Sequence, residues 1–142
     1  MLIEKNMNDE NLIGTLALVH PELKADPARK QGEIGVITYV SNEDRNIYMS
    51  FPGAGEGVYS GEAVLCLKDK SLVLDELVNN GDNMEVNDFK DLYKVTMLQD
   101  RGTSTGILSA LEIARDNRNI WAKTLEKAIP LENLNLEKVY SR

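Results

Sequence analysis

Short runs of alternating apolar and polar residues fill the first half of the chain, which is the pattern of half-buried β-strands. The clearest runs are residues 32–40, 47–51 and 63–67, and a shorter apolar run covers residues 15–20. Residues 21–31, between the runs at 15–20 and 32–40, contain two prolines. We predict a loop there, because proline supplies no hydrogen-bond donor to a strand ladder.

Residues 34–40 and 47–51 are predicted to pair as an antiparallel hairpin around a polar turn at residues 41–46. The pairing also sets the buried face, because a slip by one residue would turn every side chain to the other face. The expected pairs are Val40 with Ile47, Tyr39 with Tyr48, Thr38 with Met49, Ile37 with Ser50 and Val36 with Phe51. The expected core face holds Val36, Thr38, Val40, Ile47, Met49 and Phe51, and the outer face holds Ile37, Tyr39, Tyr48 and Ser50.

From Lys68 onward the apolar period lengthens from 2 to about 3.6 residues, which predicts helices. Four helix candidates follow, at residues 72–78, 89–96, 107–114 and 121–129. Strands first and helices second predict an α+β fold with segregated elements. The expected helix boundaries are Gly81 and Gly102 as C-terminal caps, Asn87 and Thr103 or Ser104 as N-caps, and Pro130 as a stop.

This order of elements divides the chain into a flexible tail at residues 1–13, a small β-barrel at residues 14–68 and a helical unit at residues 69–142. The strand at residues 64–67 is apolar on both faces. A strand tolerates that composition only when both faces are covered. We therefore expect the helical unit to pack on the β-barrel as one structure.

The composition fits one acidic globular protein. Its 142 residues, 42% of them hydrophobic, can bury a sizeable core. Sixteen basic and 23 acidic residues give a net charge of −7, which repels phosphate backbones and anionic lipids unless a local basic patch offsets it. The densest basic cluster, Lys24, Arg29 and Lys30, is interrupted by Asp26. One cysteine excludes an internal disulfide, and no apolar run approaches the roughly 20 residues that span a bilayer. A cytoplasmic protein is expected.

A Gly-x-Ile-Gly-x-Ile strand lies at residues 32–37, and a hairpin leads from it to the strand Tyr48-Met49-Ser50-Phe51 and then to a closing hydrophobic strand. With this pattern, residues 14–68 resemble a small SH3-like barrel of the KOW or Mind-bomb SH3 kind. The resemblance implies a module that binds a peptide, a nucleic acid or another domain, and it implies no catalysis. We recognise no family in the helical half.

No constellation of residues has the types and spacing of a catalytic, cofactor-binding or metal site. His20 is the only histidine, which excludes a multi-histidine metal site and leaves Ser-His-Asp chemistry no other base. Cys66 lies in an apolar strand without a basic neighbour, which favours a buried structural thiol. The glycine-rich residues 51–57 run into a strand and include Glu56, which favours a loop over a phosphate cradle. The abundant carboxylates lack EF-hand spacing and are expected in solvent.

The helix candidates on either side of Gly102 have the spacing of a helix-turn-helix. The second helix offers only Arg115 as a cation, whereas recognition helices normally present several basic and polar groups to DNA. An ordinary helical hairpin is therefore favoured over a DNA-binding motif.

Tyr39 and Tyr48 face each other on the outer side of the predicted hairpin. They are expected either to be half-covered by the helices or to form, together with Tyr59, an exposed aromatic surface that binds a partner. The leading hypothesis is a non-enzymatic protein-interaction or adaptor protein that binds a protein or peptide. The alternative is a nucleic-acid-binding regulator that uses the barrel or the hairpin around Gly102. An enzyme that uses carboxylates alone is a third hypothesis.

Overall fold

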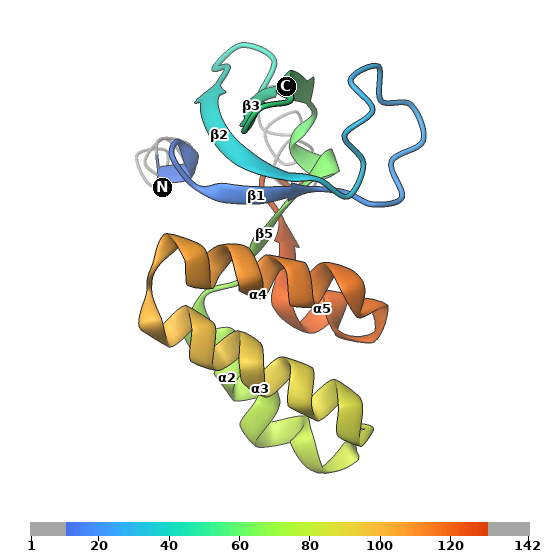
Figure 1. Cartoon of the computed structure of the whole chain (residues 1–142), viewed down its shortest axis with the longest axis vertical. Helices are drawn as coiled ribbons and strands as arrows, with labels where there is room; N and C mark the ends of the chain where they lie inside the picture. The colour runs from blue at the N-terminus through green and yellow to red at the C-terminus, as the bar shows by residue number, and fades with distance from the viewer. Residues whose placement is uncertain (1–10, 131–142) are drawn as a thin grey trace, which may run out of the picture. The chain divides into compact units, whose positions relative to one another are not determined.

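A computed structural model describes residues 11–130 and has an α+β fold, with one open antiparallel sheet and the helices α2 to α5 (Figure 1). The described residues divide into two compact units, residues 11–65 with 127–130 and residues 66–126, and each is described by itself. Most of the predicted tail, residues 1–10, lies outside the described residues. Packing of the helices on the strands stays a prediction.

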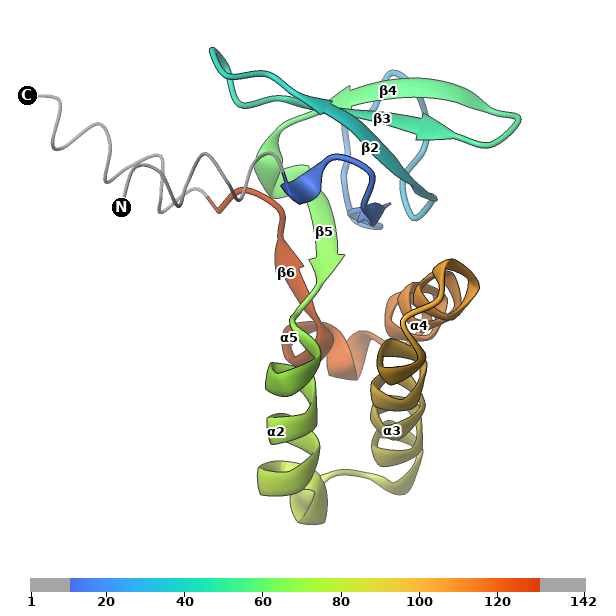
Figure 2. The same cartoon turned by 90° about the vertical axis from the view of Figure 1, so that its left-hand side faces the viewer.

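Six strands follow one another in the hydrogen-bonded order β4-β3-β2-β1-β5-β6, so β4 and β6 are the two edges of the sheet (Figure 2). A closed barrel has no such edges, and the SH3-like barrel is therefore not confirmed. A 3-10 turn, η1 (Gly61–Ala63), connects β4 to β5. The strands are β1 (Leu16–Val19), β2 (Ile34–Val40), β3 (Ile47–Phe51), β4 (Gly55–Tyr59), β5 (Val64–Leu67) and β6 (Leu125–Lys127).

The pairing of β2 with β3 keeps the predicted register next to the turn and shifts by one residue at a β-bulge around Thr38. In a β-bulge, one strand contains an extra residue, so that two of its residues lie opposite a single residue of the neighbouring strand. The predicted pairs Val40–Ile47 and Tyr39–Tyr48 are confirmed, whereas Thr38–Met49, Ile37–Ser50 and Val36–Phe51 are wrong, and the observed pairs are Ile37–Met49 and Val36–Ser50.

The same bulge changes which side chains of β2 are buried. Ile37 is fully buried although it was expected outside, and Thr38 is exposed although it was expected in the core. Val36 is only half-buried. On β3 the predicted core face is confirmed, because Ile47, Met49 and Phe51 are buried. The extra residue therefore accounts for each error on β2 and leaves β3 as predicted.

Gly35 allows β2 to lie close against β3. A Cβ atom at this position would be 2.6 Å from the carbonyl oxygen of Ser50 and 2.7 Å from Cδ1 of Phe51. Real Cβ atoms do not approach other atoms so closely, so a larger residue would force the two strands apart. The second glycine of the Gly-x-Ile-Gly-x-Ile pattern is thus explained by a close approach of two strands.

The second unit contains the helices, and their ends follow local capping chemistry. The Asp69 side chain accepts a hydrogen bond from the Ser71 backbone N–H at 3.1 Å, and its bonds to Ser71 lower the Asp69 pKa. The predicted C-terminal caps Gly81 and Gly102 and the N-cap Thr103 are confirmed, whereas the N-cap of α3 is Glu85 and not Asn87. The elements are α2 (Lys70–Asn80), η2 (Gly81–Asn83), α3 (Val86–Arg101), α4 (Ser104–Asp116), η3 (Arg118–Ile120) and α5 (Trp121–Thr124).

The helix predicted over residues 121–129 is wrong beyond Thr124, where the chain becomes extended and forms β6. The backbone N–H of Lys68 donates to the Thr124 carbonyl at 2.8 Å, and the N–H of Ala128 donates to the Val64 carbonyl at 2.8 Å. Leu125, Ala128 and Ile129 fit a helical spacing, so periodicity alone pointed to a helix. The hydrogen-bonding edge of β5 outweighs that weak local preference.

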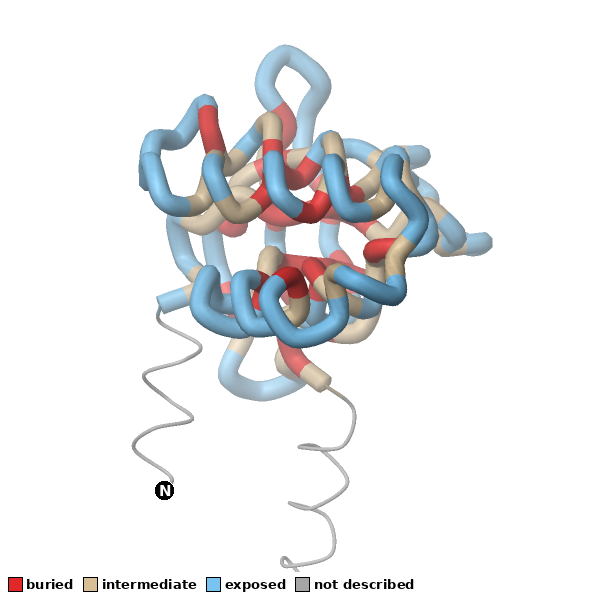
Figure 3. Tube along the Cα trace, turned by 90° about the horizontal axis from the view of Figure 1, so that it is seen from below, coloured by how far each residue is buried: buried red, intermediate tan, exposed pale blue. Residues whose placement is uncertain are grey.

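A buried apolar cluster joins α2, α3 and α4. Figure 3 shows buried positions recurring along the helices between exposed stretches, as expected for amphipathic helices. Leu67, Met84, Leu98 and Ile113 pack around this cluster. Its buried members are Val73 and Leu77 of α2, Leu92 and Val95 of α3, and Ala110 of α4.

Asn117, which follows α4, ties the end of that helix to α3 through side-chain hydrogen bonds. Its Nδ2 atom donates to Asp88 Oδ1 and to Asp91 Oδ2, both at 2.9 Å. Its Oδ1 atom accepts from the backbone N–H of Asn119 at 3.1 Å. An amide satisfies all three contacts because it offers both a donor and an acceptor.

We therefore expect Asn117→Asp to destabilise the protein more than Asn117→Ala, measured by urea unfolding at pH 7. Alanine removes the hydrogen bonds and should cost about 1–3 kcal/mol, whereas aspartate also places a third carboxylate against Asp88 and Asp91. Asn80→Ala is the control, because Asn80 is exposed on α2 and its hydrogen bond to Glu76 Oε2, at 3.1 Å, lies in solvent, so its loss should change stability by about 0.5 kcal/mol or less. Equal stability of the two Asn117 variants would contradict this account.

Candidate functional site

Three large apolar side chains form a row across the exposed face of β2, β3 and β4. Tyr39 pairs with Tyr48, and Tyr48 pairs with Val58. Their exposed fractions are 52%, 38% and 51%, so all three contact solvent together. The two tyrosine rings meet edge to face, with centroids 5.5 Å apart and an angle of 65° between their planes. We call Tyr39, Tyr48 and Val58 the strand-face row.

The β-bulge lets Tyr39 keep its place in this row while Ile37, two residues earlier on β2, is buried. In a regular strand Ile37 and Tyr39 would share a face, because side chains alternate with a period of two. The extra residue, Thr38, lets Ile37 enter the core while Tyr39 points outward. The Thr38 hydroxyl then donates to the Tyr48 carbonyl at 3.2 Å, a contact that links the bulge to β3.

Tyr59 does not belong to this surface, although the sequence placed it with Tyr39 and Tyr48. It pairs with the buried Ile47 and is itself only 5% exposed. Its hydroxyl donates to Asp26 Oδ2 at 3.2 Å, and burial and the nearby Asp26 charge raise the Tyr59 pKa to about 12. Val58 takes the expected place of Tyr59. The sequence assigned residues 51–57 to a loop, whereas β4 begins at Gly55, so it gave no register for β4 from which this exchange could be foreseen.

Asp26 is in turn held by its own loop. Its carboxylate accepts hydrogen bonds from the backbone N–H groups of Ala28 at 2.9 Å and Lys30 at 2.8 Å. Tyr59 therefore attaches the loop between β1 and β2 to the inner side of β4. The contact is structural and leaves the opposite face of the strand to the row.

The strand-face row has the properties of a contact surface and not of a reaction centre. Tyrosine offers a large, rigid area at low entropy cost and a hydroxyl that can make a hydrogen bond. Glu56 lies two residues before Val58 on β4 and is also exposed, so the same face carries a negative charge. Within residues 11–130, β4 is an edge of the sheet, and an edge strand presents backbone groups with which an extended peptide can pair.

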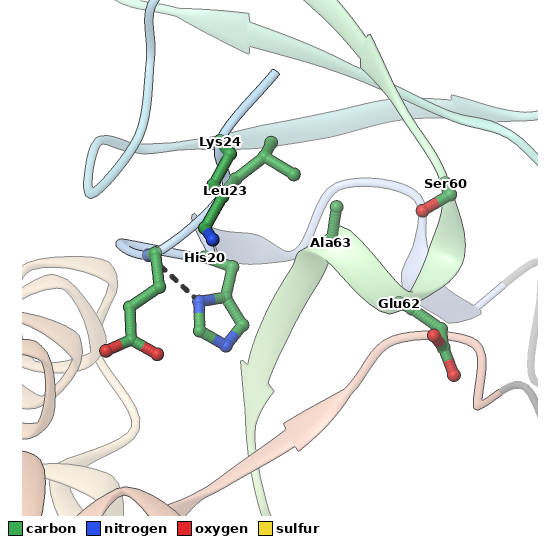
Figure 4. A pocket seen from close by; sticks show the side chains of 7 residues that line it. His20, Leu23, Lys24, Ser60, Glu62 and Ala63 are labelled. Carbon is green, nitrogen blue, oxygen red and sulfur yellow. Dashed lines mark hydrogen bonds between the residues drawn. The ribbon is translucent and has the colours of Figure 1, made fainter. Parts of the chain in front are cut away.

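A second candidate is a shallow hollow of about 430 Å³ beside His20 (Figure 4). The Nδ1 atom of His20 accepts a hydrogen bond from the backbone N–H of Glu22 at 3.1 Å, so this nitrogen is already engaged. Glu62 forms an ion pair with Lys127 at 3.4 Å, and in Figure 4 the ribbon at Ala63 runs between Glu62 and the imidazole. The residues lining this hollow are not arranged as a nucleophile with its base.

Cys66 is buried, as predicted, and burial with the nearby Glu126 charge raises its pKa to about 12. A thiol with so high a pKa is a poor nucleophile at neutral pH. Within residues 11–130, no three or more His, Cys, Asp or Glu side chains are grouped so as to hold a metal ion. None of the helices in that part of the chain combines the length and apolar character needed to cross a bilayer.

The hairpin of α3 and α4 turns at Gly102, whose φ of 71° lies in the left-handed region. The exposed residues of α4 include Thr105, Leu108 and Glu112 but no basic side chain. This composition gives no support to a DNA-recognition helix.

No family model, curated protein or solved structure matches this chain. The class that the structure itself defines is an α+β protein of two compact units with an open antiparallel sheet.

The contact between Tyr59 and Asp26 predicts a specific loss of stability at high pH. The folded-state pKa of Tyr59 is raised above its ordinary value of 10.0, so the contribution is fully present below pH 10 and is lost as the pH rises towards 12. We expect Tyr59→Phe to lower the unfolding free energy by about 0.5–1.5 kcal/mol at pH 7. Above pH 10 the wild-type protein should lose this advantage over Tyr59→Phe.

Urea unfolding between pH 7 and pH 11 measures both effects. Tyr48→Phe is the matched control, because the same hydroxyl is removed from an exposed ring and the stability curve should stay parallel to that of the wild type. A curve for Tyr59→Phe that is also parallel would show that the hydroxyl of Tyr59 has no such role.

Proposed function

We propose that this protein is a non-enzymatic interaction or adaptor protein that binds a protein or peptide through the strand-face row. The observation that carries the proposal is the exposure of Tyr39, Tyr48 and Val58 side by side on three paired strands. Scattered exposed apolar residues are ordinary, but a contiguous group on one face is typical of contact surfaces. Two tyrosines at its centre also match the residue preference of binding hot spots.

An SH3-like ancestry of the strand unit is part of this proposal. The strands β1 to β5 lie in the order β4-β3-β2-β1-β5, and such an order would close into a five-stranded barrel if β4 met β5. Only Ser60 and the turn η1 separate these two strands in the chain. The bulge in β2 and the close approach at Gly35 both favour the curvature that closure needs.

A protein partner is favoured over a nucleic acid by the charge of this face. Aromatic side chains can stack on bases, but nucleic-acid surfaces combine such rings with cations that contact phosphates. Here the charged neighbour on β4 is Glu56, and the β2–β3 turn contains two carboxylates, Glu43 and Asp44, and one cation, Arg45. A polar or extended peptide is compatible with these carboxylates, whereas a phosphate backbone is repelled by them.

The proposal predicts that Tyr48→Ala weakens capture of the partner while leaving thermal stability almost unchanged. Truncating a central tyrosine of an interface costs about 2 kcal/mol or more, or roughly 30-fold in affinity. The folded state should lose mainly the cross-strand contact of Tyr48 with Tyr39, about 0.2–1 kcal/mol. The measurement is quantitative recovery of crosslinked partners from native lysate, with the melting temperature of each variant recorded in parallel.

Leu108→Ala is the control, because it truncates an exposed apolar side chain on α4 and should recover as much partner as the wild type. A photocrosslinker placed at residue 39, 48 or 58 should label one common partner, and a crosslinker at residue 24 should not. Failure to recover any protein after crosslinking, or full recovery by Tyr48→Ala, would reject the proposal. A single-stranded DNA titration at low salt tests the alternative, because electrostatic binding is strongest there.

A further inference from the structure

A second apolar surface lies in the helical unit, between α2 and α3. At one end Leu74 of α2 and Met97 of α3 line a hollow of about 430 Å³ together with Thr96. At the other end the Phe89 ring lies against Gly81, where an added Cβ atom would be 2.8 Å from Phe89 Cε2. These two contacts fix how the antiparallel helices are aligned.

Val78 and Tyr93 fall between these two ends. Val78 is one turn after Leu74 on α2, and Tyr93 is one turn before Met97 on α3, so both continue the same faces of their helices. All five large side chains are exposed. We call Leu74, Val78, Phe89, Tyr93 and Met97 the helical groove.

The helical groove is not the core side of these helices. The core of this unit takes Val73 and Leu77 from α2 and Leu92 and Val95 from α3. Each helix therefore has two apolar rows, one buried and one exposed, whereas an ordinary surface helix has a polar outer face. From Met97 to Phe89 the exposed row on α3 extends about 12 Å, at about 1.5 Å of rise per residue. That length matches about two turns of a partner helix.

The two rims of the groove differ in charge. On α3, Thr96 and Asp100 line the hollow and therefore mark the side of the apolar row that faces α2. The positions that directly follow Phe89 and Tyr93 lie on the other side of this row, away from α2. Those positions are Lys90 and Lys94, and Arg101 continues the same row with helical spacing.

These three cations are exposed, and within the described part of the chain none of them is paired with a carboxylate. The α2 rim is neutral or acidic. It consists of Ser71, Asp75 and Asn79, which follow one another at intervals of one helical turn. Lys70 and Asp100 form an ion pair at 3.7 Å beside the hollow. Among residues 11–130, a row of positive charge without carboxylate partners thus follows one side of the apolar row and not the other.

We propose that the helical groove binds an amphipathic helix of another protein, and that this helix has acidic side chains along one side of its apolar face. The apolar face of such a helix would cover Leu74, Tyr93 and Met97, and its carboxylates would lie beside Lys90, Lys94 and Arg101. Helices commonly bind in this way, with apolar anchors at spacings of three and four residues. The one-sided charge also sets the direction in which the bound helix runs, because the same helix lying the opposite way with its apolar face still in the groove would place its carboxylates beside Asp75.

An anionic membrane would be a different occupant, and the observations favour it less. Membrane-surface helices have a polar face rich in lysine and arginine, whereas here one rim contains Asp75 and the whole chain has a net charge of −7. A second copy of the chain fits less well too, because its α2 rim would bring a single carboxylate to the three cations. The groove stands independently of the strand-face row, which belongs to the other unit.

Two designed peptides test the proposal with the full chain. Both have 18 residues and the same leucine positions, and they differ only in carrying glutamate or lysine along one flank. Fluorescence anisotropy should show that the acidic peptide binds at least about tenfold more tightly than the basic one. Tyr93→Ala should weaken the acidic peptide about fivefold or more, whereas Leu108→Ala, the same kind of truncation on α4, should change binding less than about twofold.

A charge reversal makes the test specific for the rim. In the double variant Lys90→Glu with Lys94→Glu, the preference should reverse in favour of the basic peptide, with circular dichroism confirming that the variant is folded. Absence of binding by both peptides, equal binding of the two, or an unchanged preference in the double variant would overturn the proposal. Binding to phosphatidylserine vesicles that Tyr93→Ala abolishes, or a dimer that Tyr93→Ala dissociates, would assign the groove to those occupants instead.

Discussion

The strand unit depends on one extra residue in β2. A strand alternates its side chains with a period of two, so it cannot bury Ile37 and expose Tyr39 unless the alternation is interrupted between them. The bulge at Thr38 supplies that interruption. Its consequences extend across the sheet, because Ile37 can fill the core while Tyr39 keeps its pairing with Tyr48, which is itself paired with Val58. A regular β2 would leave either a gap in the core or a break in the exposed row.

The sequence could predict what depends on neighbouring residues. The register next to the turn, the α+β order of elements and the caps at Gly102 and Thr103 each follow from local chemistry, and each is observed. The bulge could not be foreseen, because Thr38 is an ordinary strand residue. The strand β6 was missed for a different reason: Leu125, Ala128 and Ile129 satisfy a helical period, and only the edge of β5 favours the extended form.

The candidate site was predicted in part for the same physical reason. Tyr39 and Tyr48 are close to the turn that fixes their pairing, so their shared face followed from the register alone. Tyr59 lies beyond a segment that the sequence assigned to a loop, and its side of β4 could not be deduced. The structure shows why Tyr59 turns inward, since its hydroxyl finds Asp26 and its ring packs where Gly57 has no side chain. The helical groove was missed because periodicity identifies apolar positions without saying which of two apolar rows is covered.

The two proposed surfaces would recognise partners through different forces. The strand-face row is aromatic with a carboxylate beside it, so contact area would dominate its binding. The helical groove combines apolar contacts with three cations on an acidic protein. An approaching acidic partner is repelled by the net charge of −7, a repulsion that salt largely screens beyond the Debye length of about 8–10 Å, and only at contact does the partner reach Lys90, Lys94 and Arg101. Electrostatics would then slow association yet strengthen the bound state, so discrimination between helices would lie in how slowly the correct one dissociates.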